Sequence, residues 1–139
     1  MLEAGTNVRQ WLGRARGINR EIDALIHAKQ EARDQLLRIT QNYESDGAQS
    51  SKDPHKYDRL AEFENMIDQK AIELLAVRQE ITEVIGLLQD GRQRTVLLDY
   101  YVRCISLEQT AYEMHYSYAN VKKIRAKAIA AIEKKSSLK

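Results

Sequence analysis

The sequence predicts an all-α fold, in which a long antiparallel helical hairpin is followed by a C-terminal unit of shorter helices. Six Gly and one Pro among 139 residues are too few for the frequent turns of a many-stranded β fold. Apolar residues recur every seven positions through most of residues 7–88, which is typical of coiled coils. Beyond residue 90 this period stops and short capped segments take its place.

The first predicted helix begins at Asn7, which forms a plausible capping box with Gln10. Its seam consists of two rows of residues spaced alternately by three and four. Ten of the eleven seam positions are apolar or aromatic, and Lys29 is the exception. The rows are Val8, Ala15, Ile22, Lys29, Leu36 and Tyr43, and Trp11, Ile18, Leu25, Ala32 and Ile39.

A loop over about residues 45–53 is predicted to separate the two long helices, because Glu44–Lys52 breaks the period. Asp53 as N-cap and Pro54 in the first turn predict where the second helix starts. Eight of the nine positions in its seam are apolar, and Lys70 is the exception. The seam is Leu60, Phe63, Ile67, Lys70, Leu74, Val77, Ile81, Val84 and Leu88.

Folding the two helices back about the loop would pair Trp11 with Leu88, Ile18 with Ile81, Leu25 with Leu74, Leu36 with Phe63, and Lys29 with Lys70. A slip of one heptad would separate the two lysines, so the register stays open. The lysines either specify the register or extend their ammonium groups to the solvent.

Two helices bury only a thin strip, so residues 1–90 are expected to form an arm for dimerisation or partner docking. A plain helical core is the alternative. The candidate interface residues are Trp11, Ile18, Ile22, Leu25, Leu36, Phe63, Ile67, Leu74, Ile81 and Leu88.

Residues 91–139 are predicted to form a helix-turn-helix domain. A helix from Arg92 to about Arg103 has Val96, Leu97, Tyr100 and Tyr101 on its apolar side. Ser106 and Gln109 form a capping signature for a helix ending at Met114, and Ser117 caps a second helix, 118–134. The three-residue turn between them matches the motif. The expected inward residues are Leu107, Ala111, Met114, Tyr116, Val121 and Ile124.

Two residues depart from the usual motif. Thr110 stands where Ile or Val normally packs, and His115 stands where Gly normally adopts a left-handed conformation. His tolerates that conformation better than most residues, so the motif is expected to survive.

The net charge of +2 is unevenly distributed. Residues 1–56 carry +1, residues 57–90 carry −5 and residues 91–139 carry +6. Between Ser117 and Lys139, seven basic residues accompany one acid, Glu133. This asymmetry favours a polyanion at the C-terminal unit, although a solvated helix end is the simpler explanation.

The region Gly91–Glu133 resembles region four of bacterial sigma factors. The resemblance rests on Tyr100-Tyr101, the Ser106-Leu107 cap, Ala111, Met114, Tyr116-Ser117, Val121 and the basic helix up to Ala128. The layout is similar to phage and prophage proteins related in style to the RinA and ArpU late-gene regulators. They share the long helical pair, an Arg-Thr-x-Leu-like segment (Arg94–Leu97) and a Tyr-Ser-Tyr turn (Tyr116–Tyr118). The resemblance implies a phage DNA-binding transcription regulator in the bacterial cytoplasm. Relatives tend to carry Arg where this chain has Ala119, so one expected DNA contact is missing.

If the second helix of the motif enters the major groove, its first turns supply the contacts. The candidate DNA-binding residues are Ser117, Tyr118, Asn120, Lys122, Lys123, Arg125 and Lys127. Asn is suited to pair with adenine, whereas Lys adds affinity that is blind to sequence. Double-stranded DNA is the expected partner, with help from RNA polymerase or from a second copy, a dimer being favoured.

The remaining patterns exclude several classes. The sequence contains no phosphate-binding glycine loop, no His-Glu-x-x-His and no nucleophile beside a base, so no enzyme activity, cofactor or metal is expected. No apolar run approaches the length that spans a bilayer, and the start lacks the layout of a secretory signal. A lone Cys104 fits a reducing compartment.

Two other functions remain open at this point. A small terminase-type packaging protein also joins a helix-turn-helix to helical oligomerisation. A phage inhibitor with a sigma-like surface would instead occupy a host protein.

Overall fold

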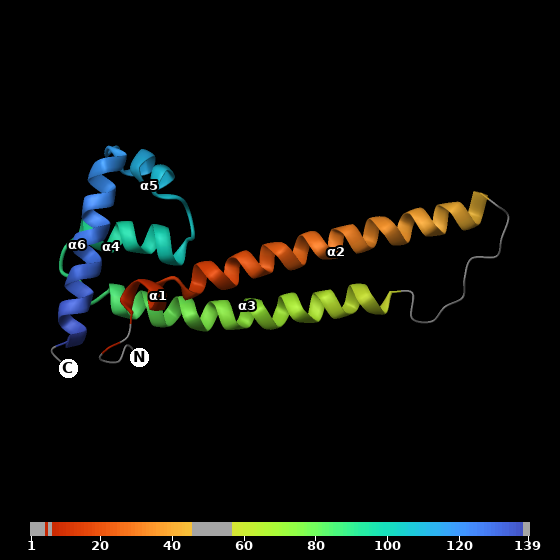
Figure 1. The fold of residues 1–139 in the computed structure, drawn as a ribbon, viewed down its shortest axis with the longest axis horizontal. Coiled ribbons are helices and arrows are strands. Elements are labelled where there is room, and N and C mark those ends of the chain that lie inside the picture. The colour runs from red at the N-terminus through yellow and green to blue at the C-terminus, as the bar shows by residue number, and fades with distance from the viewer. Residues whose placement is uncertain (1–4, 6, 46–56, 138–139) are drawn as a thin grey trace. The chain divides into compact units, whose positions relative to one another are not determined.

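The computed structural model describes residues 5, 7–45 and 57–137 (Figure 1). Within them the chain is all-helical, with six α-helices, one π-helix and no strand. The predicted fold class is therefore confirmed at that level. The chain divides into two compact units, one comprising Arg20–Glu73 and the other Met1–Asn19 with Leu74–Lys139. The helices are α1 (Val8–Leu12), α2 (Arg14–Ser45), α3 (Asp58–Ile85), α4 (Gly91–Leu97), the π-helix η1 (Leu98–Val102), α5 (Leu107–Met114) and α6 (Tyr118–Ser137).

The first predicted helix is divided by Gly13. The Asn7 side chain accepts a hydrogen bond from the Gln10 N–H at 3.1 Å, as the capping signature predicts. Gly13 then separates α1 from α2, and its N–H bonds to the carbonyl of Arg9. The apolar period continues across this break, which is why the period alone did not reveal it.

The antiparallel packing of α2 and α3 is confirmed. Helix α2 runs to Ser45, so its end overlaps the start of the predicted loop. The rest of that loop and the predicted cap at Asp53-Pro54 lie outside the described residues.

Of the two registers left open by the sequence, the one that pairs Lys29 with Lys70 is wrong, and the ion pairs favour the slip of about one heptad. The Lys70 ammonium lies 3.1 Å from a carboxylate oxygen of Glu21, and Lys29 pairs with Glu64. These partners lie eight and six residues from the predicted ones, so the register differs by about one heptad. In this register each lysine meets a carboxylate of the opposite helix, whereas the predicted one placed two cations together.

Burial along the seam differs between the two units. Ile18, Leu74, Ile81 and Leu88 are buried. The other candidate interface residues, namely Trp11, Ile22, Leu25, Leu36, Phe63 and Ile67, are half-buried. None of the described residues of Arg20–Glu73 is fully buried. The hydrophobic core therefore belongs to the other unit.

The start of α2 lies in the same unit as the C-terminal helices and is hydrogen-bonded to them. One guanidinium nitrogen of Arg16 donates to the carbonyls of Tyr100 and Ile105, at 2.9 and 3.2 Å. The Arg16 guanidinium also lies over the Tyr100 ring, 3.9 Å from its centroid. Helix α1 packs against α6 in the same unit.

We expect Arg16→Ala to lower the free energy of unfolding by about 2 kcal/mol. The substitution removes two charge-assisted hydrogen bonds and a cation–π contact from a half-buried site. Chemical denaturation followed by circular dichroism measures the loss. Arg9→Ala, at an exposed arginine of α1, is the matched control, and an equal effect of both substitutions would contradict this role for Arg16.

Candidate nucleic-acid interface

The helix before the motif ends in a π-helical turn. Asp90 caps α4 by accepting a hydrogen bond from the Arg92 N–H at 2.8 Å. The predicted helix to Arg103 continues as η1, whose wider turn is closed by the Arg103 N–H bonding to the Leu98 carbonyl. Asp99 is buried in this turn and is bonded to the Arg103 guanidinium at 2.9 Å. Cys104 then takes a positive φ of 62°, and the chain reverses into α5.

The turn between α5 and α6 is fixed by two helix caps and one left-handed residue. Ser106 caps α5 by accepting from the Gln109 N–H at 3.0 Å, and Ser117 caps α6 by accepting from the Asn120 N–H at 3.1 Å. His115 adopts the left-handed conformation, with φ 60° and ψ 38°. The N–H of Tyr116 bonds to the Ala111 carbonyl, and the N–H of His115 bonds to the Tyr112 carbonyl. This pair of bonds is a Schellman motif, which ends α5 without leaving those carbonyls unpaired.

The residues predicted to point inward form one core cluster. Leu107, Ala111 and Val121 are buried with Val96 of α4, and Tyr100, Met114, Tyr116 and Ile124 pack against them. Thr110 is fully buried, and its hydroxyl donates to the Ser106 carbonyl at 3.0 Å. Because that hydroxyl has a partner, Thr replaces the usual Ile or Val without leaving a buried polar group unpaired.

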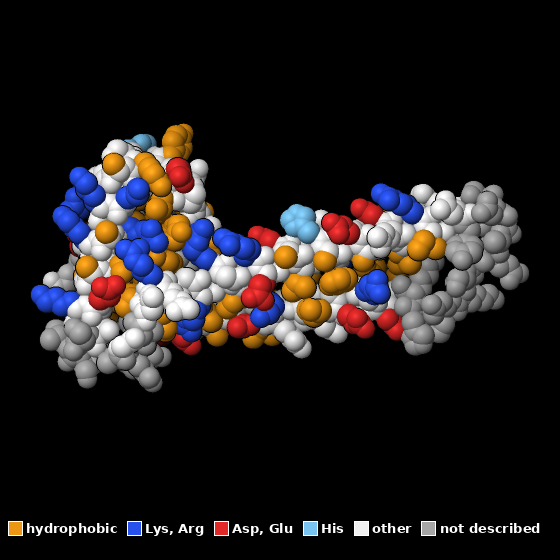
Figure 2. All heavy atoms as spheres, in the orientation of Figure 1, with side chains coloured by type: hydrophobic (Ala, Val, Ile, Leu, Met, Phe, Trp, Pro, Cys, Tyr) orange, Lys and Arg blue, Asp and Glu red, His pale blue; other side chains and the backbone are white. Residues whose placement is uncertain are grey.

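Most of the predicted DNA-binding residues lie on the exposed side of α6. Val121, Ala128 and Ile132 hold the opposite side of the helix in the core. Figure 2 shows Lys and Arg side chains gathered around α6. The exposed members of the set are Ser117, Tyr118, Asn120, Lys122, Lys123 and Lys127.

Arg125 stands apart from this set because its side chain is half-buried. Two of its guanidinium nitrogens donate to the Tyr101 hydroxyl, at 3.3 and 2.9 Å. The guanidinium also lies 4.6 Å from the centroid of the Tyr100 ring. Arg125 therefore attaches α6 to η1 through two of its five N–H donors.

The N-terminal end of α6 is electrostatically suited to an anion. The first turn contains no acidic residue, and the Lys122 ammonium lies over the Tyr118 ring, 5.3 Å from its centroid. A helix N-terminus and nearby ammonium groups both favour negative charge. Glu113, the acidic residue of α5 that is closest to α6 in sequence, has its pKa lowered by a hydrogen bond from Gln109 and by Arg103, so its charge is already compensated.

Sequence reasoning missed Arg16 and Tyr100 as a structural pair, since they lie 84 residues apart. It also missed the left-handed Cys104. A polar residue on the buried side of a helix is a signal that could have identified Arg16. No residue pattern indicates the left-handed conformation of Cys104, because Cys does not favour positive φ.

Comparisons with known proteins gave no match among protein-family models, curated proteins or solved structures.

Among the described residues no group of three or more His, Cys, Asp or Glu side chains is arranged to hold a metal ion. In the same part of the chain, no helix is both long enough and apolar enough to cross a membrane.

We expect His115→Gly to raise the free energy of unfolding by about 0.5 kcal/mol, because Gly adopts the left-handed conformation without a Cβ penalty. His115→Val should lower it by about 1–2 kcal/mol, since a β-branched side chain is strained there. The His115 side chain is exposed, so packing contributes little to either change. Urea denaturation measures both, and similar losses in the two variants would contradict the left-handed turn.

Proposed function

We propose that this chain is a DNA-binding transcription regulator of the phage type, in which α6 enters the major groove. The observation that carries the proposal is the turn from α5 to α6, where two capped helices, the left-handed His115 and a shared core support the assignment of a helix-turn-helix. Such a unit presents its second helix to DNA. The resemblance of Gly91–Glu133 to sigma region four supports the same assignment.

The exposed side of α6 has the size and charge that groove entry requires. Ala119, Ala126 and Ala130 are exposed between the lysines, so the helix backbone can come close to the base edges. The major groove is just wide enough for one helix. Lys122, Lys123 and Lys127 surround this small-residue strip and would neutralise phosphates on either side.

The individual roles follow from side-chain chemistry. Asn120 is the candidate for a specific contact, since its amide can donate to and accept from adenine at the same time. Tyr118 offers a hydroxyl for a phosphate and a ring face beside Lys122. Ser117 is committed to capping α6, so its contribution is to orient the helix.

Arg125, which the sequence analysis counted among the DNA-binding residues, has a different role in this proposal. Two of its donors bond the Tyr101 hydroxyl and its side chain is half-buried, so we assign Arg125 to positioning α6 and phosphate binding to the lysines. Arg125→Ala is then expected to lower stability, whereas a substitution at the exposed Lys123 or Lys127 is not.

We expect replacing both Lys122 and Lys123 by Ala to weaken binding and to reduce the salt dependence of binding. Each lost phosphate contact lowers the slope of log K against log salt by about 0.9. Fluorescence anisotropy with a labelled random-sequence duplex of about 30 base pairs measures both quantities. The matched control replaces Lys134 and Lys135, which removes the same charge from the far end of α6.

The outcomes separate the competing functions. An unchanged slope in the Lys122/Lys123 variant, or an equal change in the control, would contradict groove binding by α6. Absence of binding to any duplex, together with recovery of a defined host protein, would favour an inhibitor. A ring of eight or more subunits in light scattering would favour a packaging protein.

A further inference from the structure

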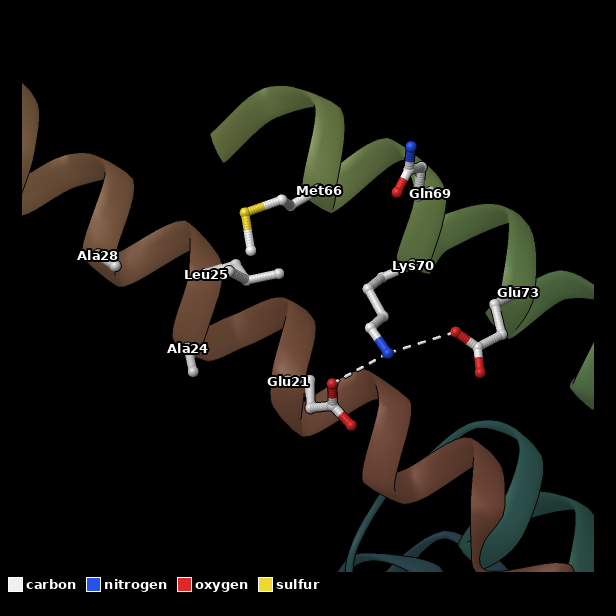
Figure 3. Close-up of a pocket in the computed structure, with 8 residues that line it drawn as sticks. All are labelled: Glu21, Ala24, Leu25, Ala28, Met66, Gln69, Lys70 and Glu73. Atoms are coloured by element: carbon white, nitrogen blue, oxygen red, sulfur yellow. Dashed lines mark hydrogen bonds and ion pairs between the residues drawn. The ribbon is translucent and has the colours of Figure 1, made fainter. Parts of the chain in front are cut away.

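A groove runs between α2 and α3 within the unit Arg20–Glu73. It has a volume of about 640 Å³ and opens to the surface. Figure 3 shows Leu25 and Met66 pointing toward one another across it. The lining residues are Glu21, Ala24, Leu25 and Ala28 of α2, and Met66, Gln69, Lys70 and Glu73 of α3.

The apolar residues of this unit are only partly covered. None of its described residues is fully buried, and Met66 and Ile39 remain 47% and 50% exposed. Figure 2 shows hydrophobic side chains open to view along the line between α2 and α3. A pair of helices gains a closed core only when further helices cover its open sides.

The charged groups of the groove are already paired with one another. Lys70 lies 3.1 Å from Glu21 and 3.3 Å from Glu73, and hydrogen bonds to these carboxylates, Glu21 first, raise the pKa of Lys70. A charged ligand would therefore have to compete for groups that are satisfied. The uncovered surface is apolar, so it fits the apolar side of a helix.

One face of α2 beside the groove carries opposite charges at its two ends, so it is complementary to the same face of a second copy. Arg20, Ala24, Ala28 and Glu31 are spaced by four, four and three residues, which places them on one side of the helix. The small alanines allow two helix backbones to approach closely. Arg20 and Glu31 are exposed, and neither makes an ion pair within the described part of the chain.

We propose that a second copy of this chain occupies the groove, with the two α2 helices antiparallel about a two-fold axis near Ala24 and Ala28. Arg20 then faces Glu31 of the partner subunit, and the two-fold axis repeats this pair. The opposite charges at the two ends of one face favour a second copy over an unrelated helix. The product is a four-helix bundle that covers the half-buried seam. This proposal does not rest on DNA binding.

Sedimentation equilibrium of the full chain tests the dimer. We expect a monomer–dimer equilibrium in which Arg20→Glu or Glu31→Arg alone raises the dimer Kd about five- to tenfold, because each change creates two like-charge pairs. The variant carrying both changes should return to nearly the original Kd, since the charges are exchanged. Circular dichroism checks that the helices persist, which these exposed positions should allow.

A bulky substitution tests the groove itself. Ala28→Arg should abolish the dimer, whereas Gln30→Arg adds the same charge to the opposite, exposed side of α2 and should leave the Kd unchanged. A wild-type monomer at all concentrations, or a closed assembly larger than a dimer, would overturn the proposal. The two-fold arrangement would be overturned if neither single charge reversal changed the dimer Kd. It would also be overturned if the variant with both reversals did not recover the original Kd.

Discussion

The contacts made by the Tyr100 ring hold together the unit that comprises Met1–Asn19 and Leu74–Lys139. Arg16 from α2 and Arg125 from α6 both place their guanidinium groups against it. Arg16 also bonds to the Tyr100 carbonyl, which lies where the wide turn of η1 ends and helical partners run out. One aromatic side chain thereby joins the start of α2 to the C-terminal helices, in addition to the packing of α1 against α6.

This connection assigns separate tasks to the basic residues of α6. Arg125 faces the core and fixes the position of the helix, whereas Lys122, Lys123 and Lys127 face the solvent. A side chain that holds the helix in place has to be buried and paired. A side chain that meets a phosphate has to be free and hydrated until it binds. From the sequence alone all four were expected to contact DNA, and burial separates Arg125 from the three lysines.

Local signals in the sequence predicted local structure well. The caps at Asn7, Ser106 and Ser117 and the left-handed His115 all follow from side-chain chemistry within a few residues. The hairpin register did not follow, because seven-residue repeats allow several alignments and the choice depends on ion pairs such as Lys70 with Glu21. The link from Arg16 to Tyr100 was also beyond reach, since it spans 84 residues. DNA binding by the exposed face of α6 was also beyond prediction from the chain alone, because it depends on contacts with a second molecule.

The most direct test of DNA recognition by α6 is an NMR titration of the full, isotope-labelled chain with duplex DNA. We expect the backbone amide signals of Tyr118–Lys127 to shift most. The amide signals of α5 should shift by a smaller amount, whereas those of residues 20–42 and 57–73 should not shift. Shifts concentrated in the hairpin, or no shift at saturating DNA, would contradict the assignment of α6 as the recognition helix.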